Sequence, residues 1–221
     1  MPNRESFRRE VDLLPVLLSS RGALVPTQPG RRIQVFEHVQ VGTIIPDLVL
    51  VASRANHTER NHLPRLTVFD AWVATVLQFG GPKAALDIAG MLHGRASRVR
   101  TSLARLKRHR LVTQASSEGV FKSNAQRIRR RAEIVAVEAK LERWSEAIQQ
   151  ARHYLTFANR AYIAIPAHRA KASNKVRQEC RKAGVGLVAV GKREASVLVR
   201  APRAEVFTPE RLWLLWRTLG T

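Results

Sequence analysis

Two charged residues interrupt an otherwise apolar run in the second half of the chain. In the segment EIVAVEAKL, residues 133–141, Glu138 and Lys140 stand two positions apart among alanine, valine and leucine. Residues two apart on a β-strand point to the same face of a sheet, so a strand here would place a carboxylate beside an ammonium group. Such a pair is either an ion pair at a solvated strand edge or part of a site that does chemistry.

A second carboxylate opens another apolar segment. Asp47 follows Pro46 and directly precedes LVLVA, residues 48–52. If the two strands are neighbours, Asp47 and Glu138 together make an oxygen site suited to Mg²⁺, with Mn²⁺ as an alternative. Lys140 could then orient or deprotonate an attacking water, or neutralise charge that develops on a phosphate.

The segment after Lys140 has the spacing of an amphipathic helix. Its apolar stripe includes Trp144 and Ile148, and Gln150 lies at the edge of that stripe, four positions before Tyr154. Gln150 could therefore reach back to the metal site or hold a phosphate. We interpret Tyr154 as a core residue that packs this helix on the sheet.

The net charge points to a polyanionic partner. The chain has 221 residues, with 38 lysines and arginines against 17 acids, which gives a formal charge of +21. Repulsion of that size favours nucleic acid as the partner class. A single cysteine, Cys180, excludes a disulfide framework and a cysteine-based zinc site. We read it as a small buried residue in a reducing compartment.

The order of elements predicts an α/β protein with a helical block inside it. A helix, two strands and a polar stretch lead to three short helices within 66–112; the strand and helix alternation returns after about residue 130. Pro15 is expected to kink or restart the first helix. No apolar run approaches membrane-spanning length, so we expect a cytoplasmic protein with no membrane partner.

The helical block resembles a winged helix-turn-helix and is strongly basic. Residues 95–131 hold twelve lysines and arginines and one acid, Glu118, which with Gly119 is expected to form the turn of a β-wing. The third helix of such a domain meets base edges and phosphates. We expect Arg98 and Thr101 to read bases and Ser97 to lie on the same DNA-binding side of this helix. The expected phosphate contacts are Arg95, Arg100, Arg105, Lys122, Arg129, Arg130 and Arg131.

Three short motifs, in this order, resemble the PD-(D/E)XK nuclease superfamily, which has the restriction-endonuclease-like fold. They are Pro46-Asp47, Glu138-Ala139-Lys140 and the Gln150/Tyr154 pair. The resemblance covers residues 1–53 and about 130–205. It implies a mixed sheet flanked by helices and a DNA phosphodiester as the substrate.

The same resemblance implies roles for individual residues. Asp47 and Glu138 would bind Mg²⁺ with the carbonyl of Ala139, Lys140 would serve the attacking water, and Gln150 would support the site. Members often carry a further acid on the first helix. Glu10 is the best-placed candidate for it and Glu37 is a second, although either could equally be an ordinary solvated residue.

One departure from the usual pattern leads to an expectation about domains. Asp47 and Glu138 are 91 residues apart, a long interval for neighbouring strands. Closing a long loop costs little more than closing a short one, so an inserted domain can account for the interval. We therefore divide the chain into 1–55, an inserted domain at 56–126, and 127–221.

Three functions remain open on the sequence alone. The first is a metal-dependent DNA endonuclease, for which a homodimer would be one way to cut both strands. The second is a non-catalytic DNA-binding protein or regulator that uses a nuclease-like scaffold. A basic RNA-binding protein is a distant third.

Overall fold

A computed structural model describes residues 7–25, 30–54, 66–115, 119–124 and 132–219. The chain forms two compact units. The first combines Met1–Arg54 with Glu133–Val206, and the second combines Ala55–Ala132 with Phe207–Thr221. The last segment therefore groups with the helical block, whereas the division drawn from the sequence placed it with the second half of the sheet.

The first unit is built on one six-stranded mixed sheet. Its strands are β1 (Arg31–Glu37), β2 (Leu48–Arg54), β6 (Ala132–Ala139), β7 (Arg160–Pro166), β8 (Gly186–Val190) and β9 (Ala195–Val199). They follow the order β1-β2-β6-β7-β8-β9 across the sheet. Strands β6, β7 and β8 are parallel, while the outer pairs β1–β2 and β8–β9 are antiparallel.

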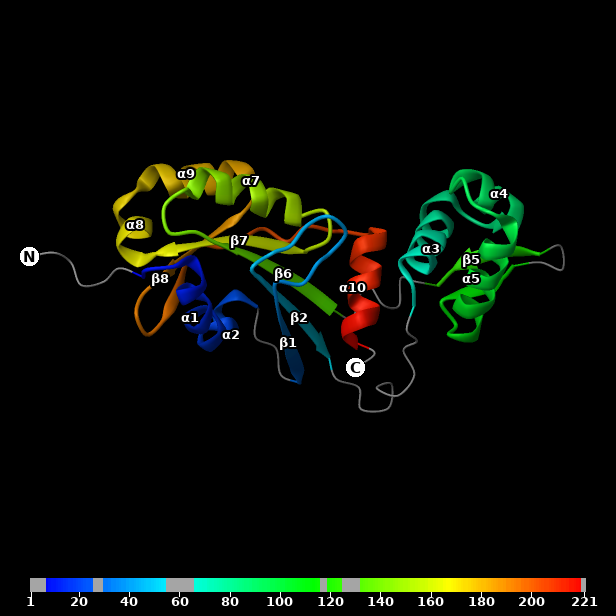
Figure 1. Ribbon diagram of the computed structural model, residues 1–221, viewed down its shortest axis with the longest axis horizontal. Coiled ribbons are helices and arrows are strands. Elements are labelled where there is room, and N and C mark those ends of the chain that lie inside the picture. The colour runs from blue at the N-terminus through cyan, green and yellow to red at the C-terminus, as the bar shows by residue number, and fades with distance from the viewer. Residues whose placement is uncertain (1–6, 26–29, 55–65, 116–118, 125–131, 220–221) are drawn as a thin grey trace, which may run out of the picture. The chain divides into compact units, whose positions relative to one another are not determined.

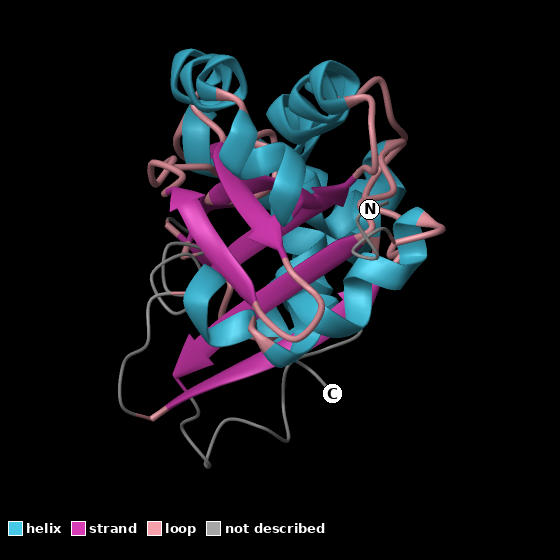
Figure 2. Cartoon of the chain, turned by 90° about the vertical axis from the view of Figure 1, so that its left-hand side faces the viewer, coloured by secondary structure: helices cyan, strands magenta, loops and turns pink. Residues whose placement is uncertain are grey.

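Helices cover both faces of this sheet (Figures 1 and 2). On one face lie the 3₁₀ turn η1 (Glu10–Leu13), α1 (Leu14–Ser19) and α2 (Arg21–Leu24); on the other lie α7 (Trp144–Tyr154), α8 (Ala167–Ala172) and α9 (Asn174–Ala183). The expected α/β class, with a mixed sheet flanked by helices, is thereby confirmed. Pro15 stands in the first turn of α1, at the restart expected for the first helix.

Strand β6 is buried along its whole length because helices cover both of its faces. Val135, Val137 and Ala139 pack into one hydrophobic core with leucines of η1, α1 and α2. The alternate positions, Ala136 and Glu138, therefore face the opposite side. This division into two faces follows directly from the two-residue repeat of a strand, and it puts a carboxylate into a buried layer.

The second unit contains α3 (Val68–Gly80), α4 (Ala85–Met91), α5 (Ala96–Arg108) and α10 (Pro209–Leu219), together with a small sheet. The sheet has three short strands in the order β3-β5-β4: β3 (Lys83–Ala84), β4 (Val112–Gln114) and β5 (Val120–Ser123). The strands on either side of Gly119 pair antiparallel. Helix α10 packs against α3 and begins after Thr208, whose hydroxyl accepts a hydrogen bond from the Arg211 amide.

A buried aspartate joins two helices of the second unit, α3 and α5. Asp70 accepts hydrogen bonds from the backbone and the hydroxyl of Thr67, which caps α3. The same carboxylate accepts from the Ser102 hydroxyl at 2.6 Å and pairs with Arg105 at 3.1 Å, both on α5. One side chain thus caps α3 and holds α5 against it.

Two aromatic residues of α3 differ from expectation. The sequence pattern places Phe69, Trp72, Val76 and Phe79 in the core of this unit, but Trp72 is 43% exposed and Phe79 is 69% exposed. The core stripe of α3 instead uses smaller residues, Ala71, Ala74 and Leu77, on the side that packs on α5. The helical period was correct and the choice of face was wrong.

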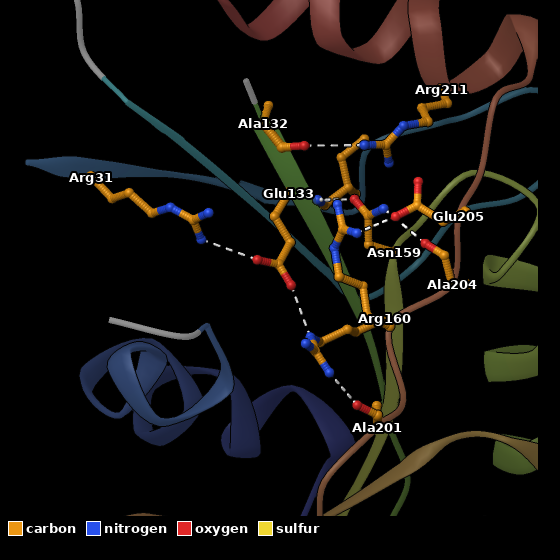
Figure 3. A network of polar contacts seen from close by, with 11 residues as sticks. Arg31, Ala132, Glu133, Asn159, Arg160, Ala201, Ala204, Glu205 and Arg211 are labelled. Atoms are coloured by element: carbon orange, nitrogen blue, oxygen red, sulfur yellow. Dashed lines mark hydrogen bonds and ion pairs between the residues drawn. The ribbon is translucent and has the colours of Figure 1, made fainter. Parts of the chain in front are cut away.

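A second buried carboxylate lies in the first unit, at the start of β6 (Figure 3). Glu133 is bound by Arg31 of β1 at 3.0 Å and by Arg160 of β7 at 2.8 Å. Arg160 also donates to the carbonyl of Ala201. This network joins three strands and the segment after β9, so it fixes the end of the sheet opposite to Lys140.

Removal of the Asp70 carboxylate should destabilise the packing of α5 on α3 in the second unit. In Asp70→Ala, the Thr67 amide, the Ser102 hydroxyl and the Arg105 guanidinium lose their shared buried acceptor, so we expect a loss of about 3 kcal/mol of local stability. Hydrogen exchange of the α5 amides measures it. Asp87 occupies the same third position of α4 but is exposed and caps only the Ala84 amide, so Asp87→Ala should cost under ~1 kcal/mol. Equal losses in the two variants would contradict this account.

Removal of Glu133 should destabilise the first unit. The Arg31 and Arg160 side chains are only 20% and 13% exposed, and Glu133→Ala would leave both cations without their shared anion. We expect a loss of about 3 kcal/mol in urea unfolding of the full chain. Glu146→Ala breaks an exposed pair with Arg143 at the start of α7 and is the matched control, with an expected loss under ~1 kcal/mol.

Candidate active site

The two carboxylates singled out in the sequence lie on neighbouring strands. Asp47 directly precedes β2, and Glu138 is the penultimate residue of β6. Strands β2 and β6 are adjacent in the sheet. The interval between the two acids is thus taken up largely by the second compact unit.

Asp47 is tied to the end of β6 by a backbone contact. Its Oδ2 accepts a hydrogen bond from the amide of Ala139 at 2.8 Å. The other oxygen, Oδ1, lies 3.8 Å from Nδ1 of His38. The beginning of β2 therefore meets the end of β6, which means that these two strands run antiparallel.

Lys140 lies between two glutamates. Its Nζ is 2.9 Å from Oε1 of Glu138 and 3.2 Å from Oε2 of Glu10. Glu10 belongs to η1, and its other oxygen accepts from the Leu141 amide at 3.4 Å. The side chain of Lys140 is 14% exposed and that of Glu10 is 42% exposed, so Glu10 faces the solvent side of the cluster.

Tyr154 completes the cluster from helix α7. Its hydroxyl donates a hydrogen bond to Oε2 of Glu138, and the residue is buried. The sequence interpretation assigned Tyr154 to the core and Gln150 to the site. Gln150 is exposed, and no hydrogen bond joins it to Glu138 or Lys140 within the described residues.

The apolar spacing of α7 is the sequence feature that points to Tyr154, and not Gln150, as the side chain that faces the sheet. Ala147, Ala151 and Tyr154 form the buried stripe of α7, which faces the sheet, whereas Gln150 lies off that stripe. A buried tyrosine hydroxyl requires a partner, and Glu138 was the acid assigned to the sheet surface.

The site shifts the pKa values of its members. Burial raises the pKa of Glu138, and the nearby charge of Asp47 raises it further, against the opposing hydrogen bonds of Tyr154 and Lys140. Burial alone would lower the pKa of Lys140, but its contacts with Glu138 and Glu10 outweigh burial and raise it. The pKa of Tyr154 is raised by burial and by Glu138, so its hydroxyl remains a proton donor.

The donor atoms suit a cation that keeps most of its own water. The described residues contain no group of three or more histidine, cysteine or acidic side chains able to hold an ion. What the site offers is two carboxylates whose charges repel each other, together with the carbonyl of Ala139, the residue that follows Glu138. Mg²⁺ is commonly bound by one or two carboxylates plus waters and substrate phosphate, so the residues fit it.

The expected DNA contacts of the second unit lie on α5 or close to it. Arg95, Ser97, Arg98, Arg100, Thr101 and Lys122 are exposed. Arg98 stacks over the ring of Phe69, with the guanidinium carbon 4.1 Å from the ring centroid, and the Thr101 hydroxyl bonds to the Ser97 carbonyl. Arg105 differs from the others, because its guanidinium is engaged by Asp70.

The remaining candidates lie elsewhere. Arg129, Arg130 and Arg131 fall outside the described residues. Glu37 is exposed at the end of β1, opposite Leu48 in the strand register. Cys180 is buried as expected, and burial raises the pKa of its thiol to about 12.

Comparisons with known proteins add little to this geometry. No protein-family model and no curated protein matches the sequence. Among solved structures, the chain is similar to the SPO1766 protein of unknown function from Silicibacter pomeroyi, at 19% identity and a TM-score of 0.30. The match covers 53% of this chain and 81% of that one. Within the described residues, no helix is long and apolar enough to cross a membrane.

Two conservative substitutions should move the pKa of Glu138 in opposite directions. Tyr154→Phe removes a hydrogen bond that favours the ionised carboxylate, so the pKa of Glu138 should rise. Asp47→Asn removes a neighbouring negative charge while it keeps an oxygen that can accept from Ala139, so that pKa should fall. Titration of the glutamate carboxyl carbons by ¹³C NMR measures both shifts, and shifts of the same sign would contradict this electrostatic assignment.

Proposed function

We propose that the protein is a metal-dependent DNA endonuclease whose site is formed by Asp47, Glu138 and Lys140. The observation that carries the proposal is the meeting of the two acids and the lysine at one end of two adjacent strands. The resemblance of the motifs named above to the PD-(D/E)XK superfamily supports the same reaction class.

The order of elements in the first unit also supports a restriction-endonuclease-like fold. Helical turns lead into the antiparallel strands β1 and β2, β6 follows beside β2, and α7 leads to β7, which is parallel to β6. This is the order that the resemblance implies, with an excursion between β2 and β6. Fold alone does not determine function, so the proposal depends on the side chains.

The chain's own residues supply most of the proposed chemistry. Asp47, Glu138 and the Ala139 carbonyl would hold Mg²⁺, which when bound would stabilise negative charge on the phosphate. The raised pKa of Lys140 keeps its ammonium group charged at neutral pH. It would therefore orient an attacking water and offset charge on the phosphate, rather than remove a proton.

Glu10 and Tyr154 would orient Lys140 and Glu138, respectively. Glu10 holds the Lys140 ammonium from the solvent side, and Tyr154 fixes one oxygen of Glu138. Both contacts restrict rotamers that would otherwise be free. We assign both residues to positioning, because neither is placed to bind the attacking water itself.

The second unit would grip the DNA as an inserted winged helix-turn-helix. Three helices, a small sheet and an antiparallel β4–β5 pair support this assignment. Helix α5 would be the recognition helix, with exposed Arg95, Arg98 and Arg100 near its start. The net charge of +21 is consistent with a polyanionic substrate.

A second candidate function is favoured by one specific observation. Both oxygens of Glu138 are already engaged, one by Lys140 and the other by Tyr154. With both oxygens engaged, Glu138 would have a structural role alone: through Tyr154 it would hold α7 against the sheet. The protein would then be a DNA-binding regulator on a nuclease-like scaffold.

A plasmid assay distinguishes the two candidates. The full chain should nick or cut supercoiled plasmid with Mg²⁺ or Mn²⁺ and not with EDTA. Lys140→Ala should lower the rate at least about 100-fold, because it removes charge stabilisation at the phosphate, while DNA affinity stays within about threefold. The matched control is Lys182→Ala, an exposed lysine paired with Glu179 on α9, and its rate should not change.

The Asp47 variants separate chemistry from folding. Asp47→Asn should abolish cutting with little loss of stability, because an oxygen remains to accept from the Ala139 amide. Asp47→Ala should lose both cutting and stability. DNA binding by the wild type without cutting, across metals and DNA forms, would favour the scaffold alternative.

A further inference from the structure

A cleft lies between α8 and the turn that joins β8 to β9. It is lined by Ala167, His168 and Lys171 of α8 and by Val190, Gly191 and Lys192 of the β8 end. Its volume is about 200 Å³. With roughly 30 Å³ for each water molecule, it can hold a phosphate group with part of the attached sugar.

The lining carries hydrogen-bond donors and cations but no acid. Lys171, Lys192 and His168 are exposed, and no ion pair neutralises either lysine among the described residues. The neighbouring Arg169 differs, because it is paired with Glu142 at 2.8 Å and is not part of the lining. The residues that line the cleft therefore carry net positive charge.

Its position in the sheet relates it to the candidate active site. Strands β6, β7 and β8 are parallel, so their carboxyl ends lie along one edge. Lys140 follows the end of β6, whereas the cleft lies at the ends of β7 and β8. Neighbouring strands are about 4.8 Å apart, which places the cleft roughly 10 Å along this edge from Lys140.

We propose that this cleft binds a backbone phosphate of the DNA strand, a few nucleotides at most from the phosphate at Lys140. The proposal rests on the proposed function for its substrate class. Two lysines and a histidine line this cleft, without an acid among its lining residues, at the edge where the candidate site lies. Lysine is a common phosphate ligand, and contacts of this kind position a nucleic acid without reading its sequence.

The test is the salt dependence of DNA binding by the full chain. Fluorescence polarisation with a labelled oligonucleotide duplex in EDTA measures affinity without cutting. Lys171→Gln combined with Lys192→Gln should weaken binding about tenfold at low salt and reduce the slope of log K against log[salt] by about 0.9 for each lost phosphate contact. An unchanged slope would overturn the proposal.

The matched control removes the same charge from the opposite edge of the sheet. Arg181 and Lys182 are exposed in the last turn of α9, which leads into the amino end of β8. The double variant Arg181→Gln, Lys182→Gln loses two positive charges, and its affinity should stay within about twofold of the wild type. A loss equal to that of the cleft variant would mean that net charge alone is responsible.

Oligonucleotides that differ in their 5′ end distinguish a backbone phosphate from a terminal phosphate as the group bound in the cleft. Duplexes with a 5′-hydroxyl and with a 5′-phosphate should lose affinity equally in the cleft variant, because a backbone phosphate is present in both. A loss confined to the 5′-phosphate duplex would overturn the backbone assignment.

The test separates this proposal from the proposed function. If the wild type binds DNA, the cleft variant binds it more weakly, and neither cuts, the phosphate-binding proposal is supported and the endonuclease proposal is wrong. If the cleft variant binds DNA like the wild type while Lys140→Ala abolishes cutting, the endonuclease proposal is supported and the phosphate-binding proposal is wrong.

Discussion

The buried strand β6 is the constraint on which the rest of the first unit depends. Helices cover both of its faces, so every polar group on it must find a partner within the protein. At its start Glu133 is bound by two arginines, and near its end Glu138 is bound by Lys140 and Tyr154. The two ends of one strand thus hold buried carboxylates satisfied in different ways.

The two carboxylates differ in the charges that surround them. The partners of Glu133 are permanently charged guanidinium groups on neighbouring strands, which suit a fixed ion pair. Glu138 faces another carboxylate, and burial and Asp47 raise its pKa. A carboxylate held against its electrostatic preference is a common property of functional sites. We take this contrast along β6 as the main physical reason to look for chemistry at the Lys140 end.

Much of this arrangement could be read from the sequence, for identifiable reasons. The two-residue repeat of 133–141 gave the faces of β6, and the apolar run after Asp47 gave the neighbouring strand. The choice between Gln150 and Tyr154 depended on how α7 is rotated, which a stripe of small residues defines only loosely. The pairing of Arg105 with Asp70 could not be foreseen, because it joins residues 35 positions apart on two helices and requires the packing of those helices. The exposure of Trp72 and Phe79 was not predicted, because large apolar residues are ordinarily assigned to the core.

The place where the chain leaves the sheet has an evolutionary consequence. The excursion departs from the end of β2 and returns at the start of β6, so it opens and closes on two adjacent antiparallel strands. Strand β6 rises about 3.3 Å per residue, which separates this junction from Lys140 by roughly 25 Å. Both junctions of the excursion therefore lie at the end of β6 opposite to Asp47 and Glu138. Insertions or deletions at these junctions would change the length of the excursion without altering the strand ends that carry Asp47, Glu138 and Lys140.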